Sequence, residues 1–141
     1  MKKFLVIGLG NPGPEYAHTR HNIGFDIVDA WAQASTSIFS PARYGDRAQI
    51  KLKGRTVILI KPTTFMNLSG QSVGEAMRFF KLEAPDITVF HDEIDLAPGK
   101  VRVKDGGGHA GHNGLRSLHQ HIGPHYTRVR MGVGHPGHKD A

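Results

Sequence analysis

The chain is 141 residues long, a length that suits one domain with a single buried core. It contains no cysteine, which excludes a disulfide framework, a zinc-thiolate site and a cysteine nucleophile, and which fits a reducing cytoplasm. No run approaches the roughly 20 apolar residues that span a bilayer. We therefore expect a soluble cytoplasmic protein that does not enter a membrane.

The formal net charge is +6, and the positive excess lies in the last third of the chain. Residues 1–95 hold 11 Lys and Arg against 10 Asp and Glu, whereas residues 96–141 hold 7 against 2. A one-sided basic region is the electrostatic footprint of a polyanion partner. A merely soluble basic surface has the same composition, so charge alone does not decide between the two.

The first elements expected along the chain are a strand and a helix. The apolar run KFLVIG, residues 3–8, is typical of a buried strand that ends at glycine. Residues 22–34 follow with helical spacing, and Asn22 is the expected N-cap. The residues expected on the buried face of this helix are Ile23, Ile27, Ala30, Trp31 and Ala34.

A hairpin and a second helix come next. AQIKLK and RTVILIK flank Gly54 and predict two antiparallel strands, of which the second should be central because residues 57–60 are all apolar. Residues 69–81 predict the helix, in which Ser72 and Glu75 can form a capping box. Its expected buried residues are Val73, Ala76, Met77 and Phe80.

The remaining elements complete an α/β pattern. Residues 87–90 predict a buried strand, residues 99–104 an alternating strand, and residues 128–134 another strand, with a short helix at 113–122. Strands interleaved with helices favour an α/β fold. We expect a single domain over residues 1–141, with a mixed, largely parallel twisted sheet and helices on both faces.

Three of the expected strands run directly into polar residues. The first leads to Asn11, the second hairpin strand to Asn67, and the strand at 87–90 to Asp92. Ligands of parallel sheets bind where loops leave the carboxyl ends of the strands. If these strands are parallel neighbours, the three side chains converge on one rim, which is the candidate site.

The GLGNPG segment matches the G-x-G-x-x-G pattern of dinucleotide-binding proteins. That pattern needs a helix that opens within the glycines, so that its N-terminus meets the pyrophosphate. Here Pro12 and the following PGPEY predict a rigid turn, and Asp26 and Asp29 lie inside the expected helix. A turn that presents Asn11 is favoured, and a dinucleotide-dependent enzyme is the alternative that NAD(P) titration tests.

The HTRHN segment supplies a candidate base in His21, which lies between a rigid turn and a helix. Its ordinary pKa is close to neutral, so the imidazole can take a proton from water. A carboxylate on the other ring nitrogen would fix the tautomer, and HDEID offers Asp92, Glu93 and Asp95. Strand alternation would prevent Asp92 and Glu93 from both pointing into one site. A solvated acidic loop is the alternative reading of HDEID.

GGGHAGHNG, residues 106–114, predicts a glycine loop that leads into a helix and can approach an anion or ligand closely. It lacks the Gly-Lys-Ser/Thr ending of a P-loop, which disfavours nucleotide hydrolysis. Histidines are frequent in this third of the chain, but none belongs to an HExxH pattern, so we expect no metal. These histidines are His109, His112, His119, His121, His125, His135 and His138.

The TTFMNLSG segment has two readings. Phe65 and Met66 can pack into the core at the entry to a helix. They can instead form an apolar lip beside the amide of Asn67, where a peptide group would bind.

Five segments of the chain together resemble the bacterial peptidyl-tRNA hydrolase family in order, spacing and residues. The resemblance runs from about residue 4 to residue 137. The segments are GLGNPGPEYAHTRHNIGF, KPTTFMNLSG, HDEIDLAPGKVRVK, GGGHAGHNGL and RVRMGVGHPG.

This resemblance implies cleavage of the ester that joins a peptide to the 3′ ribose of tRNA, with release of tRNA for reuse in translation. It implies that His21 activates water, that Asp92 orients His21, and that Asn11 positions the histidine region. It implies no cofactor and no metal. A monomer is expected, because no heptad pattern demands a partner.

The resemblance also implies the residues that bind the substrate. Asn67 and Asn113 would hold the peptide end and steady the attacked carbonyl, and Tyr16 and Met66 would line the substrate channel. The side chains implied at the tRNA phosphate are Lys104 and Arg130 as a clamp, with Arg102 and Arg128 as neighbours.

Members of this family continue several tens of residues beyond the GHPGHKDA that ends this sequence. We therefore expect the chain to lack the family's lid-like loop and helix and its C-terminal helix. A non-catalytic fragment that still binds tRNA through its basic flank is the alternative function.

Overall fold

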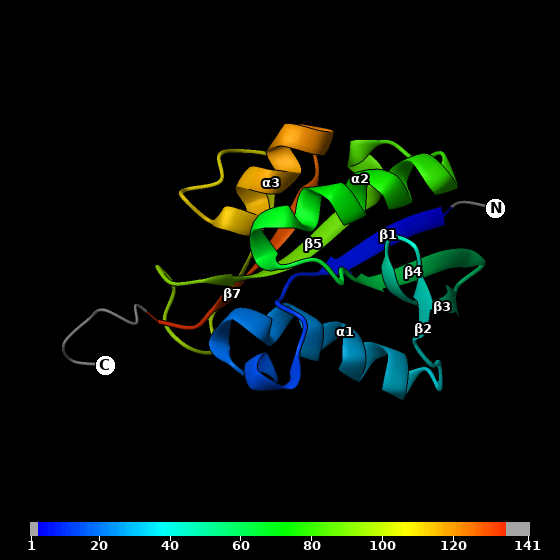
Figure 1. Ribbon diagram of the computed structural model, residues 1–141, viewed down its shortest axis with the longest axis horizontal. Helices are drawn as coiled ribbons and strands as arrows, with labels where there is room; N and C mark the ends of the chain where they lie inside the picture. Colours follow the sequence, from blue (N-terminus) through cyan, green and yellow to red (C-terminus); the bar gives the residue numbers. More distant parts are fainter. Residues whose placement is uncertain (1–2, 135–141) are drawn as a thin grey trace.

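A seven-stranded sheet forms the centre of the computed structural model, which describes residues 3–134. The strand order is β2-β3-β4-β1-β5-β7-β6 (Figure 1). The strands are β1 Lys3–Gly8, β2 Ser40–Ala42, β3 Gly45–Leu52, β4 Arg55–Lys61, β5 Ile87–Glu93, β6 Val101–Asp105 and β7 Thr127–Gly132. The four strands β4, β1, β5 and β7 pair in parallel, whereas β2, β3 and β6 form antiparallel pairs at the two edges. This mixed sheet confirms the predicted fold class.

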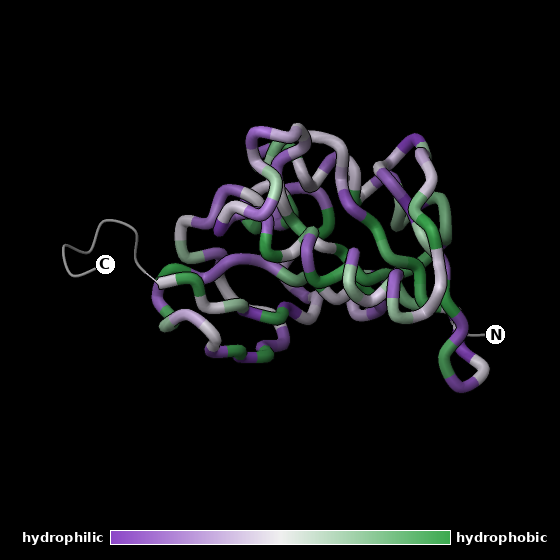
Figure 2. The backbone as a smooth tube through the Cα atoms, turned by 90° about the horizontal axis from the view of Figure 1, so that it is seen from below, coloured by the Kyte–Doolittle hydropathy of each residue, from purple (hydrophilic) through white to green (hydrophobic). Residues whose placement is uncertain are grey.

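Helices cover both faces of the sheet. Helix α1, Ile23–Ala34, lies on one face, and α2, Ser69–Phe80, and α3, Asn113–Ile122, lie on the other (Figure 1). Alternation along β1 supplies both cores, because Leu5 packs on the α2 and α3 side and Val6 on the α1 side. Figure 2 shows the apolar segments concentrated in the interior of the molecule. Among residues 3–134, no helix is long and apolar enough to cross a membrane.

The buried face of α1 differs from the predicted one. Ala30 and Ala34 are exposed, while the buried residues are Gly24, Val28 and Ala32. Gly24 decides this, because a Cβ built there would lie 2.5 Å from both the Leu9 nitrogen and the Phe90 oxygen. Close packing of the helix on β1 and β5 therefore selects a glycine-containing face that hydrophobicity alone does not indicate.

Neither predicted helix cap is present. The Asn22 side chain makes no capping hydrogen bond, because it binds the backbone of Asn11 instead. Ser72 and Glu75 do not form a capping box, since α2 begins at Ser69 and both lie within it. Ser72 is buried beside Thr64, and Glu75 forms an ion pair with Arg43 at 2.5 Å.

The strands depart from the expectation most at β5 and β2, while the ends of β3, β6 and β7 differ from the predicted ranges by one to three residues. Strand β5 continues to Glu93 rather than ending at Phe90, so Asp92 is part of the strand. The short edge strand β2 was not predicted, because its sequence, SPA, carries no apolar alternation and contains proline. Helix α3 begins and ends at the predicted residues, and β4 is an interior strand as expected.

Candidate active site

Two histidines share the carboxylate of Asp92 at the carboxyl end of β5. Asp92 is only 3% exposed. Its Oδ2 accepts a hydrogen bond from Nδ1 of His21 at 2.5 Å, and its Oδ1 accepts one from Nε2 of His112 at 2.7 Å. The contact with His21 was predicted from the sequence, whereas the contact with His112 was not.

The hydrogen-bond network assigns the proton positions on both rings. Nδ1 of His112 accepts from the backbone N–H of Leu115 at 3.2 Å, which caps α3, so the ring proton is on Nε2 and points at Asp92. His21 donates through Nδ1, which leaves Nε2 with its lone pair. The His21 side chain is 60% exposed, so this nitrogen is accessible to water.

A pair of asparagines fixes the turn that carries His21. The Asn22 side chain accepts from the Asn11 backbone N–H and donates to the Asn11 carbonyl, both at 2.8 Å. The Asn11 side-chain oxygen in turn accepts from the Met66 backbone N–H at 2.6 Å. Asn11 therefore ties the loop after β1 to the loop after β4 and contacts the segment next to His21, rather than the Asp92 carboxylate.

The charge on Asp92 is maintained despite burial. Burial by itself raises the pKa of Asp92, but the hydrogen bonds and electrostatic attraction of His112, and then of His21, outweigh it. The pKa therefore lies below its usual value, and Asp92 is ionised at neutral pH. An ionised carboxylate stabilises an imidazolium that forms on His21.

His91 is a buried neighbour of this pair of histidines. Its Nδ1 donates to the Asp92 carbonyl at 2.8 Å, its ring is 5.0 Å from that of His112, and its Nε2 is buried with no hydrogen-bond partner among the described residues. Burial, followed by the charge of His112, lowers the pKa of His91 to about 4. His91 is therefore neutral and serves as a packed, hydrogen-bonded support for the site.

Stability should fall on acidification because of His91. Between pH 6.5 and pH 4 the unfolded chain binds the proton that folded His91 excludes, so the free energy of unfolding decreases as pH decreases. From pH 7 to pH 4.5 this residue should contribute a loss of about 2–3 kcal/mol. Urea unfolding at both pH values should show a smaller loss in His91→Gln, and an equal loss in both proteins would contradict the assignment.

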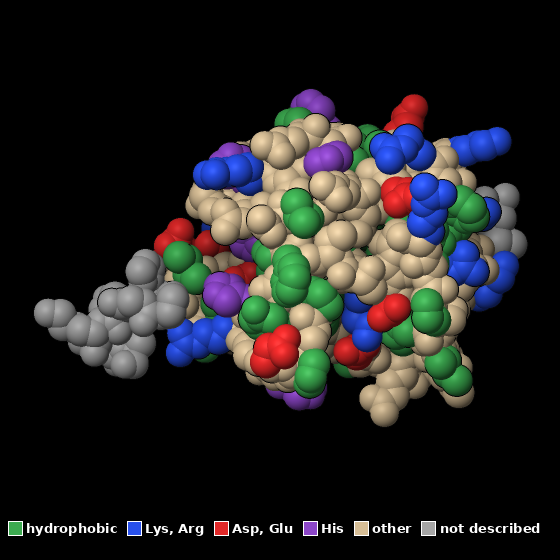
Figure 3. Space-filling model, in the orientation of Figure 1, with side chains coloured by type: hydrophobic (Ala, Val, Ile, Leu, Met, Phe, Trp, Pro, Cys, Tyr) green, Lys and Arg blue, Asp and Glu red, His purple; other side chains and the backbone are tan. Residues whose placement is uncertain are grey.

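A hollow of about 210 Å³ opens beside these side chains. Its lining combines a base, carboxylates, a thioether and the loop before α3. The lining residues are His21, Met66, Asp92, Glu93, Ile94, Asp95, His109, Ala110, Gly111, His112 and Asn113. Asp92 and Glu93 both line it, which corrects the expectation from strand alternation, because the hollow lies over the end of β5 rather than on one face. Figure 3 shows histidine and acidic side chains gathered near that end of the molecule.

The expected substrate-contacting residues are only partly brought together. Met66 and Asn113 line the hollow. Tyr16 and Asn67 do not line it; Asn67 is exposed, and the Tyr16 ring is 6.3 Å from that of Phe65 in an edge-on contact. Phe65 is 52% exposed, as the apolar-lip interpretation requires, whereas Met66 is half-buried and packs against the core, as the other interpretation requires.

The basic residues expected at a phosphate fall into two groups. Lys104 and Arg102 are exposed on β6, and Arg130 on β7 is half-buried and paired with Glu93. Arg128 is only 1% exposed, so it is too buried to contact an RNA phosphate, and this prediction was wrong. Its guanidinium is used internally, where it donates to two backbone carbonyls and lies over a tyrosine ring. These partners are Gly108, Pro124 and Tyr126.

The described part of the chain, residues 3–134, contains no group of three or more His, Cys, Asp or Glu side chains arranged to hold a metal. His109 and His119 contact each other through their rings at 5.4 Å. His135 and His138 lie outside the described residues.

The fold and these contacts define an α/β protein with a solvent-accessible histidine oriented by a buried carboxylate at the carboxyl ends of parallel strands. The sequence matches the family described as peptidyl-tRNA hydrolase over residues 5–141. The chain therefore belongs to the peptidyl-tRNA hydrolase family.

Individual relatives agree with this placement. A peptidyl-tRNA hydrolase of Jannaschia sp. is 67% identical over 96% of this chain and 57% of its own length, and one of Dinoroseobacter shibae is 66% identical over 96% and 58%. The crystal structure of peptidyl-tRNA hydrolase from Acinetobacter baumannii superposes with a TM-score of 0.92 at 45% identity, over 97% of this chain and 71% of that one. The chain thus spans a little under three fifths of the length of the Jannaschia and Dinoroseobacter proteins.

Proposed function

We propose that this chain hydrolyses the ester between a peptide and the 3′ ribose of tRNA, as a cytoplasmic monomer without cofactor or metal. The observation that carries the proposal is the orientation of His21 by the buried, ionised Asp92, which leaves Nε2 accessible to water beside the hollow. An ester is more labile than an amide, so one positioned base and donors at the developing oxyanion suffice.

The reaction follows from the proton positions. Nε2 of His21 takes a proton from water, and the resulting hydroxide oxygen bonds to the ester carbonyl carbon. The negative charge that develops on the carbonyl oxygen is stabilised by the amide of Asn113, which lines the hollow, whereas Asn67, exposed outside the hollow, would hold the peptide end. The carbon–oxygen bond to the ribose then breaks, the ribose oxygen takes the proton back from His21, and the peptide leaves as a carboxylic acid.

Asp92 and Asn11 act in this scheme without touching the substrate. Asp92 holds the His21 tautomer and stabilises the imidazolium formed after the first proton transfer. Asn11 secures the turn next to His21 through its bonds to Asn22 and Met66. The peptide would lie over Met66 and the exposed Phe65, with Tyr16 against that ring.

The test is a turnover assay of the 141-residue chain on a peptidyl-tRNA carrying a labelled peptide. Release of the peptide and of tRNA with a free 3′ hydroxyl is expected. Salt-sensitive tRNA binding without any release would instead establish the alternative, a tRNA-binding fragment.

Lys104 should contribute directly to tRNA affinity. It is exposed on β6 and is free of ion pairs with the described residues. Lys104→Ala should weaken tRNA binding and reduce the slope of log Kd against log salt by about 0.7–0.9. The control is Lys53→Asn, which removes the same charge at the tip of the β3–β4 hairpin, where a φ of 50° suits asparagine. Equal slopes for the two variants would contradict a phosphate contact at Lys104.

A further inference from the structure

A second carboxylate, next to Asp92, joins the hollow to the basic strand pair β6–β7. Glu93 is the last residue of β5, and its side chain is 13% exposed. Oε1 accepts from Nε of Arg130 at 3.1 Å, and Oε2 accepts from the backbone N–H of Asp95 at 3.3 Å. Asp95, like Glu93, lines the hollow. One side chain therefore contacts both a cation of the basic flank and the loop at the rim of the hollow.

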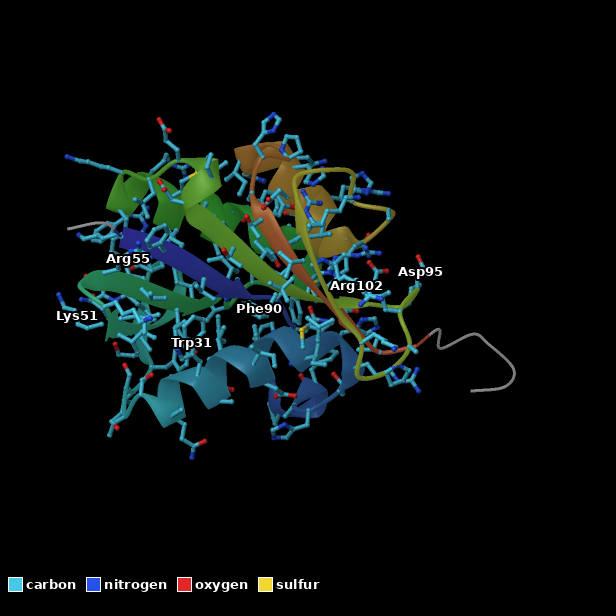
Figure 4. All side chains as sticks on the ribbon, turned by 180° about the vertical axis from the view of Figure 1, so that it is seen from behind. Trp31, Lys51, Arg55, Phe90, Asp95 and Arg102 are labelled. Atoms are coloured by element: carbon cyan, nitrogen blue, oxygen red, sulfur yellow. The ribbon has the colours of Figure 1, made fainter. Side chains whose placement is uncertain are left out.

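The surroundings of Arg130 explain why a carboxylate is placed there. Arg130 lies directly opposite Arg102 in the β6–β7 ladder, and like charges in this arrangement repel. Glu93 engages Nε, and among residues 3–134 no other acceptor is hydrogen-bonded to this guanidinium, so its two terminal nitrogens are available to an anion. Figure 4 shows Arg102 and Asp95 at the same end of the sheet.

We infer that Glu93 is a positioning residue with two roles; this inference rests on the proposed function. It competes with RNA phosphate for Arg130, and it anchors the Asp95 loop beside the reacting groups. Without RNA, Glu93 neutralises Arg130 and weakens its attraction for any polyanion. A phosphate that binds the terminal nitrogens must share the guanidinium with Glu93. The Glu93–Arg130 ion pair therefore lowers the affinity for RNA, while the contact of Glu93 with the Asp95 N–H orders the loop at the rim of the hollow.

The chemistry of glutamine makes this inference testable. A carboxylate offers two acceptor oxygens, one each for Arg130 and the Asp95 N–H, whereas an amide offers only one. Glu93→Gln therefore removes a negative charge and at least one of the two contacts. Affinity for RNA should rise while turnover falls, whereas general destabilisation of the fold would lower both.

The experiment measures tRNA binding and turnover on the same set of proteins. Glu93→Gln should lower the Kd for deacylated tRNA about threefold to tenfold at low salt and steepen the salt slope by about 0.7–0.9. Its kcat on peptidyl-tRNA should fall about fivefold, which corresponds to the loss of one anchoring contact worth about 1 kcal/mol. Glu93→Asp keeps the charge and should retain the wild-type salt slope.

The matched control is Glu75→Gln, which removes one negative charge from another glutamate–arginine pair, on α2 and away from the hollow. It should change neither slope nor kcat. A wild-type salt slope in Glu93→Gln, or weaker tRNA binding together with lower kcat, overturns the inference. If the wild-type chain itself releases no peptide, the proposed function fails, and the binding data still decide whether Glu93 competes for Arg130.

Discussion

His21→Ala is expected to lower kcat on peptidyl-tRNA by about 10²–10⁴-fold, the usual contribution of a general base. The loss should appear in kcat, because His21 is proposed to act on water rather than to bind tRNA. Affinity for deacylated tRNA and its salt dependence should be unchanged. Single-turnover release of labelled peptide, measured beside tRNA binding, separates the two effects.

The control for this substitution lies three residues away in the same turn. The His18 side chain is 86% exposed and pairs with Asp26 at 3.1 Å, outside the hollow. His18→Asn suits the backbone there, where φ is 60°, and should keep wild-type kcat. Undiminished peptide release by His21→Ala would contradict the proposed role of His21, whereas a comparable loss in His18→Asn would attribute the effect to the turn.

Much of the fold was predictable, because strand and helix signals in this sequence are strong and local. KFLVIG is apolar on both faces, as a strand covered by helices on both sides requires, and β1 begins and ends at the predicted residues. The face of α1 was not predictable, because it depends on how closely Gly24 approaches β1 and β5. Figure 4 shows Trp31 and Phe90 between that helix and the sheet.

The candidate site was predicted only in part, because one of its contacts depends on tertiary packing that leaves no local signal in the sequence. The rule that ligands bind at the carboxyl ends of parallel strands singled out Asp92, which lies near the end of β5 and lines the hollow. Its second partner, His112, was missed because a histidine within a glycine loop gives no local signal of its role. Its position directly before a predicted helix was the available clue, since the N-cap of α3 lies over the end of β5.

Arg128 was assigned to a binding site that its side chain does not reach. The resemblance to the peptidyl-tRNA hydrolase family implied that Arg128 lies beside the phosphate clamp, and this prediction was wrong because the side chain is buried and donates to the Gly108 carbonyl in the loop that precedes α3. Burial there lowers the pKa of Arg128. The two backbone carbonyls it binds replace part of the lost hydration, while Nε is buried with no hydrogen-bond partner among the described residues. The Arg128 charge contributes to the positive excess of residues 96–141, but the folded chain buries it away from the surface.

Asp92→Asn is expected to lower kcat by about 10²–10⁴-fold while leaving most of the fold intact. Both His21 and His112 direct an N–H at the Asp92 carboxylate. An asparagine amide has one accepting oxygen and one donating nitrogen, so it can satisfy only one of these donors. The other histidine must change its tautomer or lose its contact.

The two possible tautomer changes have different consequences. A proton moved to Nε2 of His21 removes the lone pair that would take the proton from water, so kcat falls with little loss of stability. A proton moved to Nδ1 of His112 breaks the cap on the Leu115 N–H, which should lower the free energy of unfolding by about 1 kcal/mol. Nitrogen NMR of the two rings, together with kcat and urea unfolding, identifies which change occurs. Wild-type kcat in Asp92→Asn would refute the proposed orientation of His21, since the negative charge that stabilises its imidazolium would then contribute nothing.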